Sequence, residues 1–590
     1  MGIEFLVKRF MAIRSASLGR YSPADGCIYY LSDITGTYQL WRSCGGRHDI
    51  VVPWDRRVGD YVISSKGSLA FASDFDGDEK WAIYVYEGND VWRIAGEDGS
   101  MNLLGAWSPD GKRLAYTSNA RNGVDFDLYI YDAVRRESRL VYEGDGMIVP
   151  QAWIGDRVVS VKRNSNLDSD ILVIDAETGK AENITKHEGE AENTNPVPVD
   201  SSRLLYITNH EREFKALSLY DLEKNSSRIL FSPEGDVELV DYYEGTVIAS
   251  VNSMGSSRIY RLRLGTDRAA QILGVYDGNW VVTSIHSEGG VTVLSASSPR
   301  EGNEVYLLRE RVERVTWSPK LGLEENFVEP RHFEYESFDG LRIHGLLYEP
   351  SKNRRVKTPY PAVLWLHGGP ESQSRPSFNT LQQAMTSLGI GVVAPNFRGS
   401  TGYGKTFVHL DDLEKRINAV KDVYYAVKHL TSEGIIDPER LCVMGGSYGG
   451  YLTLMSLALY PDTWRCGVEI VGIVNLVTFI RNTSPYRRRY RIPEYGDPDK
   501  HADIMLELSP ITHAHKIRAP LMVIHGANDP RVPLSEAKQI VETLKEKGVE
   551  VRYIELKDEG HGIAKIENRI KVYTEALKFL AEKLLDKREA

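Results

Sequence analysis

The first half of the chain repeats one strand pattern at a nearly constant interval, and this repeat limits the folds that the chain can adopt. An alternating apolar strand followed by a polar turn recurs seven times between residues 25 and 318. The central residues of these strands are Leu40, Tyr84, Tyr129, Leu172, Ser218, Tyr260 and Tyr306, at spacings of 44, 45, 43, 46, 42 and 46 residues. Leucine-rich repeats have shorter units, and helical repeats have helical periodicity, which this segment lacks. Both classes of repeat are therefore excluded.

The length of the repeat is typical of a β-propeller, in which each blade is a four-stranded sheet of about 40–50 residues. Trp107-Ser-Pro-Asp-Gly-Lys112 is a turn of the kind that leads into a propeller strand, and Trp317-Ser-Pro-Lys320 is a looser copy. We therefore predict an all-β, seven-bladed propeller over residues 25–318, preceded by an N-terminal segment at 1–24. A pair of large β-sandwiches is the alternative, which the regular interval disfavours.

After a linker at residues 319–333, short apolar strands alternate with helices over residues 334–590. A hairpin with the turn Asp339-Gly340 comes first. The later strands are expected at 362–366, 390–394, 441–444, 468–471, 521–524 and 551–556. Crossover helices between such strands produce a doubly wound, mostly parallel sheet, whose functional residues lie at the carboxyl ends of the strands.

A serine lies directly after one of these strands. Gly445-Gly-Ser447-Tyr-Gly449 follows the strand 441–444 and opens a helix at 448–459. A G-x-S-x-G sequence in this context forms a sharp turn that lifts the serine hydroxyl above the sheet, and glycines flank it because larger side chains would collide. A plain glycine-rich turn is the alternative. Since strand, turn and helix agree, we predict an α/β-hydrolase domain with Ser447 as nucleophile.

A serine nucleophile needs a base and a carboxylate that orients the base, and an α/β-hydrolase carries them in the order serine, acid, histidine. Asp529 comes after the strand 521–524, and His561 comes after the strand 551–556, between two glycines. Both therefore lie where the sheet places functional groups. We predict that His561 is the base and that Asp529 orients it. Asp558 and Glu559 could compete with Asp529, but because they share a short loop with the histidine they are expected to be surface residues.

Acyl transfer also requires donors for the oxyanion of the tetrahedral intermediate. His367-Gly-Gly-Pro370 ends the strand 362–366, and such a motif presents backbone N–H groups to the oxyanion. We expect the N–H of Gly369 to be one donor and the N–H of Tyr448 to be the second. A β-turn without a donor role is the alternative.

Composition and charge narrow the class of protein. The chain is 42% hydrophobic and 26% charged, as in an ordinary globular protein, and its net charge of −10 argues against a nucleic-acid partner. The four cysteines show no C-x-x-C spacing, so we expect a reducing interior without a disulfide framework, and no structural zinc. Charges interrupt the N-terminal apolar residues, which disfavours a signal peptide or membrane anchor. A soluble, cytoplasmic protein without a membrane partner is expected.

At these motifs the sequence resembles the prolyl oligopeptidase family of serine peptidases, in which a seven-bladed propeller covers an α/β-hydrolase. The resemblance extends over nearly the whole chain, and the segments that carry it are 337–345, 367–370, 396–404, 445–450 and 525–533. It also implies that the N-terminal segment 1–24 packs on the hydrolase domain.

Within the family, the chain looks most like the acylaminoacyl-peptidase branch. Asp529-Pro-Arg531 matches the arginine that follows the triad aspartate in that branch, which implies that Arg531 holds a substrate carbonyl near the acylated end. The His-Gly-Gly-Pro motif also fits, and Glu211-Arg-Glu213 is an unconvincing match to a paired-glutamate motif for a free amino terminus. The resemblance implies hydrolysis of short peptides through an acyl-enzyme, with release of N-acylated amino acids and without a cofactor or metal.

Several features leave alternatives open. Val474, Leu476 and Phe479 could wall the pocket for the residue before the cleaved bond or could equally be core. Five arginines, at 481, 487, 488, 489 and 491, could attract a peptide carboxylate, although a solvated or salt-bridged surface loop is the favoured interpretation. A dipeptidyl peptidase, a prolyl-endopeptidase-like oligopeptidase, a carboxylesterase and a non-catalytic propeller binding module are the rival functions. The oligomeric state, a homo-oligomer included, is open.

Overall fold

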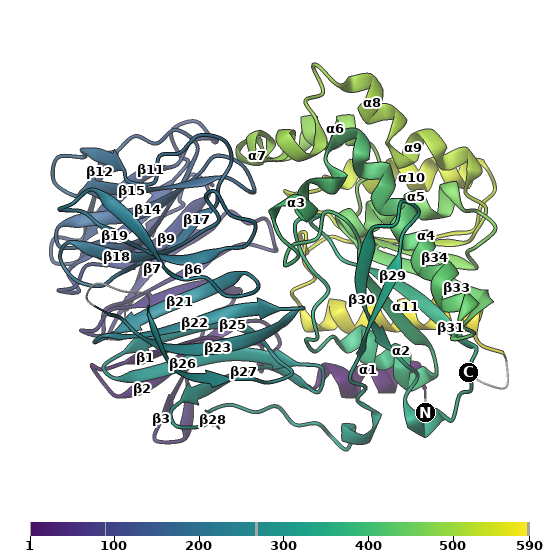
Figure 1. Ribbon diagram of the computed structural model, residues 1–590, viewed down its shortest axis with the longest axis horizontal. Coiled ribbons are helices and arrows are strands. Elements are labelled where there is room, and N and C mark those ends of the chain that lie inside the picture. The colour runs from purple at the N-terminus through teal and green to yellow at the C-terminus, as the bar shows by residue number, and fades with distance from the viewer. Residues whose placement is uncertain (1, 89, 266–269, 587–590) are drawn as a thin grey trace.

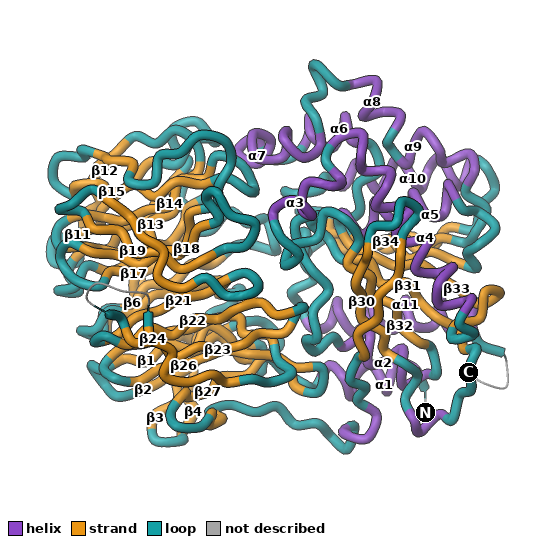
Figure 2. The backbone as a smooth tube through the Cα atoms, viewed as in Figure 1, coloured by secondary structure: helices purple, strands orange, loops and turns teal. Residues whose placement is uncertain are grey.

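The computed structural model describes residues 2–88, 90–265 and 270–586. It consists of an all-β body and an α/β body that lie side by side (Figure 1). Strands dominate the first body, whereas nearly all helices belong to the second, as Figure 2 shows. The chain enters the sheet of the second body through β29 (Arg331–Glu336) and stays in that body to Asp586, the last described residue.

Seven four-stranded antiparallel sheets form the first body, which confirms the predicted seven-bladed propeller. The blades are β1–β4 at residues 16–52, β5–β8 at 58–95, β9–β12 at 102–142, β13–β16 at 147–183, β17–β20 at 193–231, β21–β24 at 237–276 and β25–β28 at 281–314. The ring closes because Ile28 and Tyr30 of blade one pack with Val293 and Val305 of blade seven in one hydrophobic cluster.

An eight-stranded sheet forms the centre of the second body, in the order β29-β30-β32-β31-β33-β34-β35-β36. The first two pairings are antiparallel and all the others are parallel, which confirms the predicted α/β-hydrolase sheet. The remaining strands are β30 Arg342–Tyr348, β31 Tyr360–Leu366, β32 Gly391–Asn396, β33 Ile436–Gly446, β34 Cys466–Ile470, β35 Leu521–Gly526 and β36 Val551–Leu556.

Helices cover both faces of this sheet, and each face has its own apolar cluster. The helices of the second body are α2 Thr380–Leu388, α3 Lys405–Val408, α4 Arg416–Ser432, α5 Tyr448–Leu459, α6 Leu476–Asn482, α7 Pro485–Tyr495, α8 Ala502–Glu507, α9 Pro510–His513, α10 Leu534–Glu546 and α11 Ile566–Leu584. In the described residues, no helix combines the length and the apolar character needed to cross a membrane.

The N-terminal segment is divided between the two bodies. Helix α1 (Ile3–Met11) buries Leu6, Val7 and Phe10 against α2 and α11 of the hydrolase, and Figure 1 shows the three helices together. Strand β1 (Ala16–Ser22) instead pairs with β2 (Cys27–Ser32) in the first blade. The boundary expected at residue 25 thus falls between β1 and β2. The alternation of β1 is broken at Leu18, which has a φ of +52°, and this break hides the strand in the sequence.

The four cysteines form two disulfides, so the expectation of unpaired thiols is wrong. Cys27–Cys44 joins β2 to β3 (Gln39–Cys44), and Cys442–Cys466 joins β33 to β34. In both pairs the partners lie on neighbouring strands, with Cα atoms 4.6 and 4.8 Å apart. That proximity depends on which strands pair and in which register, and the spacing of the cysteines in the sequence carries no sign of it.

Candidate active site

Ser447 occupies the turn between β33 and α5. Its φ of +58° and ψ of −118° are a strained conformation for a residue with a side chain, at a cost of about 1–3 kcal/mol. Glycines surround it because a Cβ at Gly445 would lie 2.4 Å from Gly449 O and a Cβ at Gly449 would lie 2.1 Å from Leu366 O. The N–H of Ser447 donates to Ile470 O at 2.9 Å, which ties the turn to β34.

Asp529 and His561, which the sequence separates by 32 residues, meet at the carboxyl ends of β35 and β36. Nδ1 of His561 lies 2.7 Å from Oδ2 of Asp529. The Asp529 side chain is fully buried, whereas that of His561 keeps 15% of its surface exposed. Burial would raise the pKa of Asp529, but His561 and the hydrogen bonds to the carboxylate outweigh burial and lower the pKa. The lowered pKa favours the anionic carboxylate, which is the form that the predicted orienting role of Asp529 requires.

The hydroxyl of Ser447 belongs to the same end of the sheet as this pair, since β33, β34, β35 and β36 run parallel and adjacent. In the part of the chain that the structure describes, the hydrogen bonds do not include one between Ser447 and His561. Catalytic hydrogen bonds are often long in the absence of substrate and shorten in the complex.

The predicted oxyanion loop lies against the nucleophile. A Cβ placed on Gly368 would lie 3.3 Å from the Cβ of Ser447, so the loop approaches as closely as a glycine permits. Gly369 has a φ of +117°, and a side chain there would meet the backbone of Glu371 at 2.6 Å. Tyr448 is the first residue of α5, where backbone N–H groups have no partner within the helix. Gly369 and Tyr448 remain the predicted donors.

The propeller contributes a residue that sequence reasoning missed. Glu79, on the loop between β6 (Leu69–Ser73) and β7 (Ala82–Glu87), contacts Arg531 Nε through Oε1 at 2.7 Å and Arg487 Nη2 through Oε2 at 2.6 Å. Both arginines belong to the hydrolase. Nothing in the sequence signals this pairing, because it joins residues 408 and 452 positions apart.

The same propeller loop holds the segments that carry Asp529 and His561. Asp76 contacts Lys565 at 2.6 Å, and its carbonyl accepts a hydrogen bond from the Asn528 side chain at 3.1 Å. Gly77 and Gly560 touch so closely that a Cβ on Gly560 would lie 1.9 Å from Gly77 O. A cavity of about 360 Å³ opens beside this loop, with Glu79, Tyr486 and Pro530 in its lining.

The three residues expected to wall a specificity pocket are in the hydrophobic core. Val474, Leu476 and Phe479 each have 0% of their surface exposed and belong to the larger apolar cluster of the hydrolase. Glu536 holds their segment by accepting the N–H groups of Val474 at 3.0 Å and Asn475 at 2.7 Å. Their role as a pocket wall stays a prediction.

The arginine-rich segment 481–491 does not form a uniform solvated surface. Arg487 pairs with Glu79, Arg489 pairs with Asp145 of the propeller at 2.7 Å, and Arg488 donates to backbone carbonyls of α6. Arg491 lies over the ring of Phe479, 4.8 Å from its centroid. Arg487 and Arg489 thus fasten α7 to the propeller, which agrees with the salt-bridged form of the favoured interpretation and not with a solvated loop.

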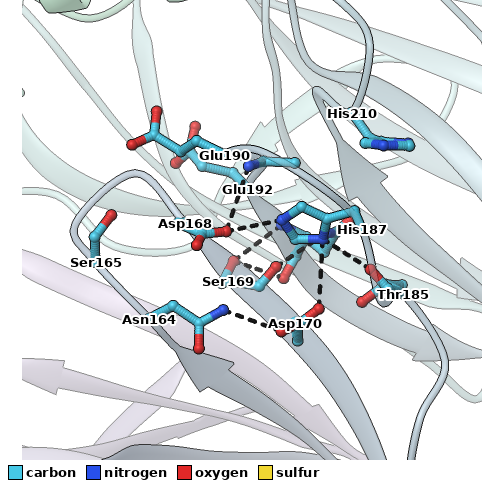
Figure 3. Close-up of polar contacts among 12 residues, drawn as sticks. Asn164, Ser165, Asp168, Ser169, Asp170, Thr185, His187, Glu190, Glu192 and His210 are labelled. Carbon is cyan, nitrogen blue, oxygen red and sulfur yellow. Dashed lines mark hydrogen bonds and ion pairs between the residues drawn. The ribbon is translucent and has the colours of Figure 1, made fainter.

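A second contact between the bodies starts from a polar cluster in blade four. His187 is held between Asp168, 2.9 Å from Nε2, and the Thr185 carbonyl, 2.9 Å from Nδ1, in a cluster that Figure 3 shows with Glu190 beside it. Oε1 of Glu190 lies 2.7 Å from Nε2 of His409 in the hydrolase, whose Nδ1 lies 2.8 Å from Asp412. The hydrogen bonds to Asp412 and Glu190 raise the pKa of His409 to about 10.

Among the residues that the structure describes, two groups of side chains bring three possible metal-ligand atoms within 4.8 Å of one another. One contains Cys27 and Cys44, whose sulfurs are joined in a disulfide and are not thiolates. The other is Asp411, Asp412 and Glu494, where Arg416 already contacts Glu494 at 2.8 Å. An arginine in that position supplies the positive charge that a cation would otherwise bring.

Comparison with known proteins places the hydrolase in a family. Residues 376–587 match the model of the prolyl oligopeptidase family. Dipeptidyl aminopeptidase BIII of Pseudoxanthomonas mexicana is 37% identical over 225 residues, 37% of this chain and 33% of that protein. Dipeptidyl peptidase family member 6 of Caenorhabditis elegans is 35% identical over 333 residues, 52% of this chain and 45% of that protein. Acylamino-acid-releasing enzyme of Arabidopsis thaliana is 32% identical over 235 residues, 37% of this chain and 30% of that protein.

These matches span 30 to 45% of the length of the curated relatives. Solved structures extend the likeness in fold to the whole chain. A puromycin-hydrolyzing peptidase of Mycobacterium tuberculosis superimposes with a TM-score of 0.87 at 20% identity, covering 99% of this chain and 96% of that one. The acylaminoacyl peptidase of Pyrococcus horikoshii gives 0.77 at 20% identity, covering 98% and 97%. The catalytic part of this chain, residues 376–587, therefore belongs to the prolyl oligopeptidase family.

Proposed function

We propose that the protein is a serine peptidase in which Ser447 is the nucleophile, His561 the general base and Asp529 the residue that orients it. The observation that carries this proposal is the strained turn at Ser447, which lies at the same end of the sheet as Asp529 and His561. Nδ1 of His561 is 2.7 Å from Oδ2 of Asp529. Strain at a partly exposed serine, at the same end of the sheet as an oriented imidazole, is the arrangement of a nucleophile, and a binding module has no need of it.

The reaction follows from these positions. Ser447 Oγ attacks the peptide carbonyl while His561 takes its proton, and the N–H groups of Gly369 and Tyr448 receive the oxyanion. His561 then protonates the leaving amine, and an acyl-enzyme remains on Ser447. Water, deprotonated by the same histidine, releases the acid. His561 alternates between neutral imidazole and imidazolium, which Asp529 stabilises as an anion.

The arrangement around Glu79 favours a substrate with a blocked amino end. Both carboxylate oxygens of Glu79 are already in contact with arginines, one with Arg531 and one with Arg487. Two cations around one anion leave an excess of positive charge, which disfavours a peptide ammonium group and suits the neutral carbonyl of an N-acyl group. We propose release of N-acylated amino acids from short peptides, with Arg531 as the group that receives the acyl-end carbonyl.

The names of the relatives supply the rival substrates. Relatives are called dipeptidyl aminopeptidase and acylamino-acid-releasing enzyme, and one structural neighbour is called puromycin hydrolase. A panel of acetyl-amino-acid anilides, free X-Pro anilides, internal-Pro peptides and simple esters separates these functions by kcat/KM. We expect the acetylated substrates to be preferred over the free-amine substrates by at least about tenfold, a difference of 1.4 kcal/mol. Preference for a free amine or an internal proline would contradict the blocked-end proposal.

The propeller is proposed to limit access to short peptides, and the cytoplasm is proposed as the location. The two disulfides remove the argument from unpaired thiols on which that location rested.

A further inference from the structure

The backbone on both sides of the predicted donor Gly369 is held by side chains. Nδ1 of His367 lies 2.8 Å from Gly368 O, the carbonyl of the peptide that carries the Gly369 N–H. The hydroxyl of Tyr495 donates to Gly369 O, the next carbonyl, at 2.8 Å. Because a peptide unit is planar, His367 sets the direction of the Gly369 N–H by holding the Gly368 carbonyl. Tyr495 holds the following unit, Gly369–Pro370, which has no N–H of its own and fixes the other side of Gly369. His367 and Tyr495 together therefore fix the orientation of the loop at Gly369.

Tyr495 is itself held by a buried arginine. Arg416 is fully buried and pairs with Glu494 at 2.8 Å. Its guanidinium carbon lies 4.4 Å from the centroid of the Tyr495 ring and 5.2 Å from that of Tyr448, within the range of cation–π attraction. Tyr448 is also anchored through its hydroxyl, which donates to Asp411 at 2.8 Å.

This cluster joins the two donors of the oxyanion hole. Gly369 is attached to it through Tyr495, and Tyr448, the other donor, is a member of it. The loop after β31 and the start of α5 are separate segments, so their relative position needs a common support. Donors aimed at the oxyanion act only when they are preorganised, and a shift of about 1 Å in the geometry of a site can lower the rate by about 100-fold.

We propose that Tyr495 is a positioning residue for the oxyanion hole, which holds Gly369 by its carbonyl, and that Arg416 supports Tyr495 and Tyr448 as one unit. The inference rests on the proposed function. Arg416 is not the residue to replace in a test, because its removal would leave Glu494 buried without its partner and would destabilise the fold. Tyr495→Phe removes one hydroxyl and leaves the ring over the guanidinium.

Tyr451→Phe is a matched control. The Tyr451 ring also lies over Arg416, at 5.9 Å, and it is fully buried, but its hydroxyl donates to Leu508 O at 2.9 Å and not to the oxyanion loop. Both variants lose one buried hydrogen bond of a phenol to a backbone carbonyl. The melting temperature reports the loss of one hydrogen bond, which the two variants share. The kinetic constants report the contact with the oxyanion loop, which only Tyr495→Phe loses.

We expect Tyr495→Phe to lower kcat by about 10- to 100-fold with KM changed by less than about twofold, because the loss falls on the transition state. A peptide aldehyde, which forms a tetrahedral adduct with the serine, should bind more weakly by a similar factor. Tyr451→Phe should keep kcat and aldehyde affinity within about twofold of the wild type, since its hydroxyl lies on another segment.

The inference is contradicted if the two variants have the same kcat and the same aldehyde affinity, or if Tyr495→Phe raises KM and leaves kcat unchanged. Wild-type protein that hydrolyses none of the acylated, free-amine or ester substrates would instead contradict the proposed function, and this inference with it. Active wild-type protein with an unaltered Tyr495→Phe variant would overturn the positioning role alone.

Discussion

The two carboxylate oxygens of Asp529 contact different groups. Oδ2 faces His561, and Oδ1 accepts the N–H groups of Arg531 at 2.8 Å and Val532 at 3.0 Å. The backbone bonds fix the carboxylate in the loop, so that the loop presents a single oxygen to the imidazole. Because its pKa is depressed, the stability that this carboxylate contributes is present above the pKa of an unfolded aspartate. It is lost as the pH falls through the lower pKa of the folded state.

Replacement of the carboxylate by an amide tests the orienting role. Asp529→Asn keeps the size of the side chain but removes the charge that stabilises imidazolium and selects the tautomer with a proton on Nδ1. We expect kcat to fall by about 10⁴-fold, as for the equivalent change in other serine hydrolases. Circular dichroism checks that the variant folds. A folded Asp529→Asn variant that keeps more than about a tenth of the wild-type kcat would show that another group orients His561.

At the scale of single residues, the sequence identifies candidate functional residues that have a characteristic local pattern. Ser447 and His561 are recognisable because each lies among glycines on a turn or short loop that follows a strand. Glu79 and Tyr495 are not, since the first acts across the domain interface and the second acts through a hydrogen bond to Gly369 from a helix 126 residues away. A side chain whose contact is with a residue far away in the sequence has no recognisable pattern in the residues around it.

Among the elements, α6 depends on a carboxylate from another helix. Glu536 of α10 is fully buried, accepts the N–H groups of Val474 and Asn475, and also contacts the hydroxyl of Thr478 at 2.5 Å. These N–H groups precede α6, where a helix has donors without intrahelical partners. The contact fixes the segment that follows the carboxyl end of β34, next to the nucleophile turn.

Removal of this carboxylate should destabilise the fold. Glu536→Ala leaves two buried N–H groups without an acceptor, and we expect a loss of about 1–3 kcal/mol in the free energy of unfolding. Glu542→Ala, on the exposed face of the same helix, is the control and should change the free energy by less than about 0.5 kcal/mol. Urea unfolding measures both. Equal effects of the two substitutions would show that Glu536 does not support α6.

Most strands of the propeller blades are predictable from the sequence. Alternation of apolar side chains within each strand is local, and its repetition seven times determines the architecture. Strand β1 is missed because Leu18 and Gly19 interrupt that alternation at a bulge. The disulfides are missed because the pairing of β2 with β3 and of β33 with β34 is a property of the sheet.

At the scale of the whole molecule, charged contacts hold the propeller to the hydrolase. Glu190 and Asp412 come from different bodies and meet on the two nitrogens of His409. Lys405 of the hydrolase also donates to the carbonyl of Glu190. Because the pKa of His409 is about 10, the ring is protonated at neutral pH, and the contact is then a bridge of one cation between two anions.

This bridge should be sensitive to alkaline pH. The folded pKa of His409 is above its unfolded value, so its contribution to stability is fully present below about pH 6.5 and is lost as the pH rises through about 10. We expect His409→Gln to lower the melting temperature at pH 7, and the difference from the wild type to shrink towards pH 10.5. A difference that stays constant over this range would show that the charge on His409 does not hold the bodies together.

The most direct test of the central claim is the reaction of the protein with a fluorophosphonate, followed by mass spectrometry of the labelled peptide and by turnover of an acetyl-amino-acid anilide. We predict that wild-type protein is labelled at Ser447 and hydrolyses the anilide. Ser447→Ala should be neither labelled nor active, while it melts within a few degrees of the wild type. Hydrolysis by a folded Ser447→Ala variant, or labelling of the wild type at a different serine, would contradict the account.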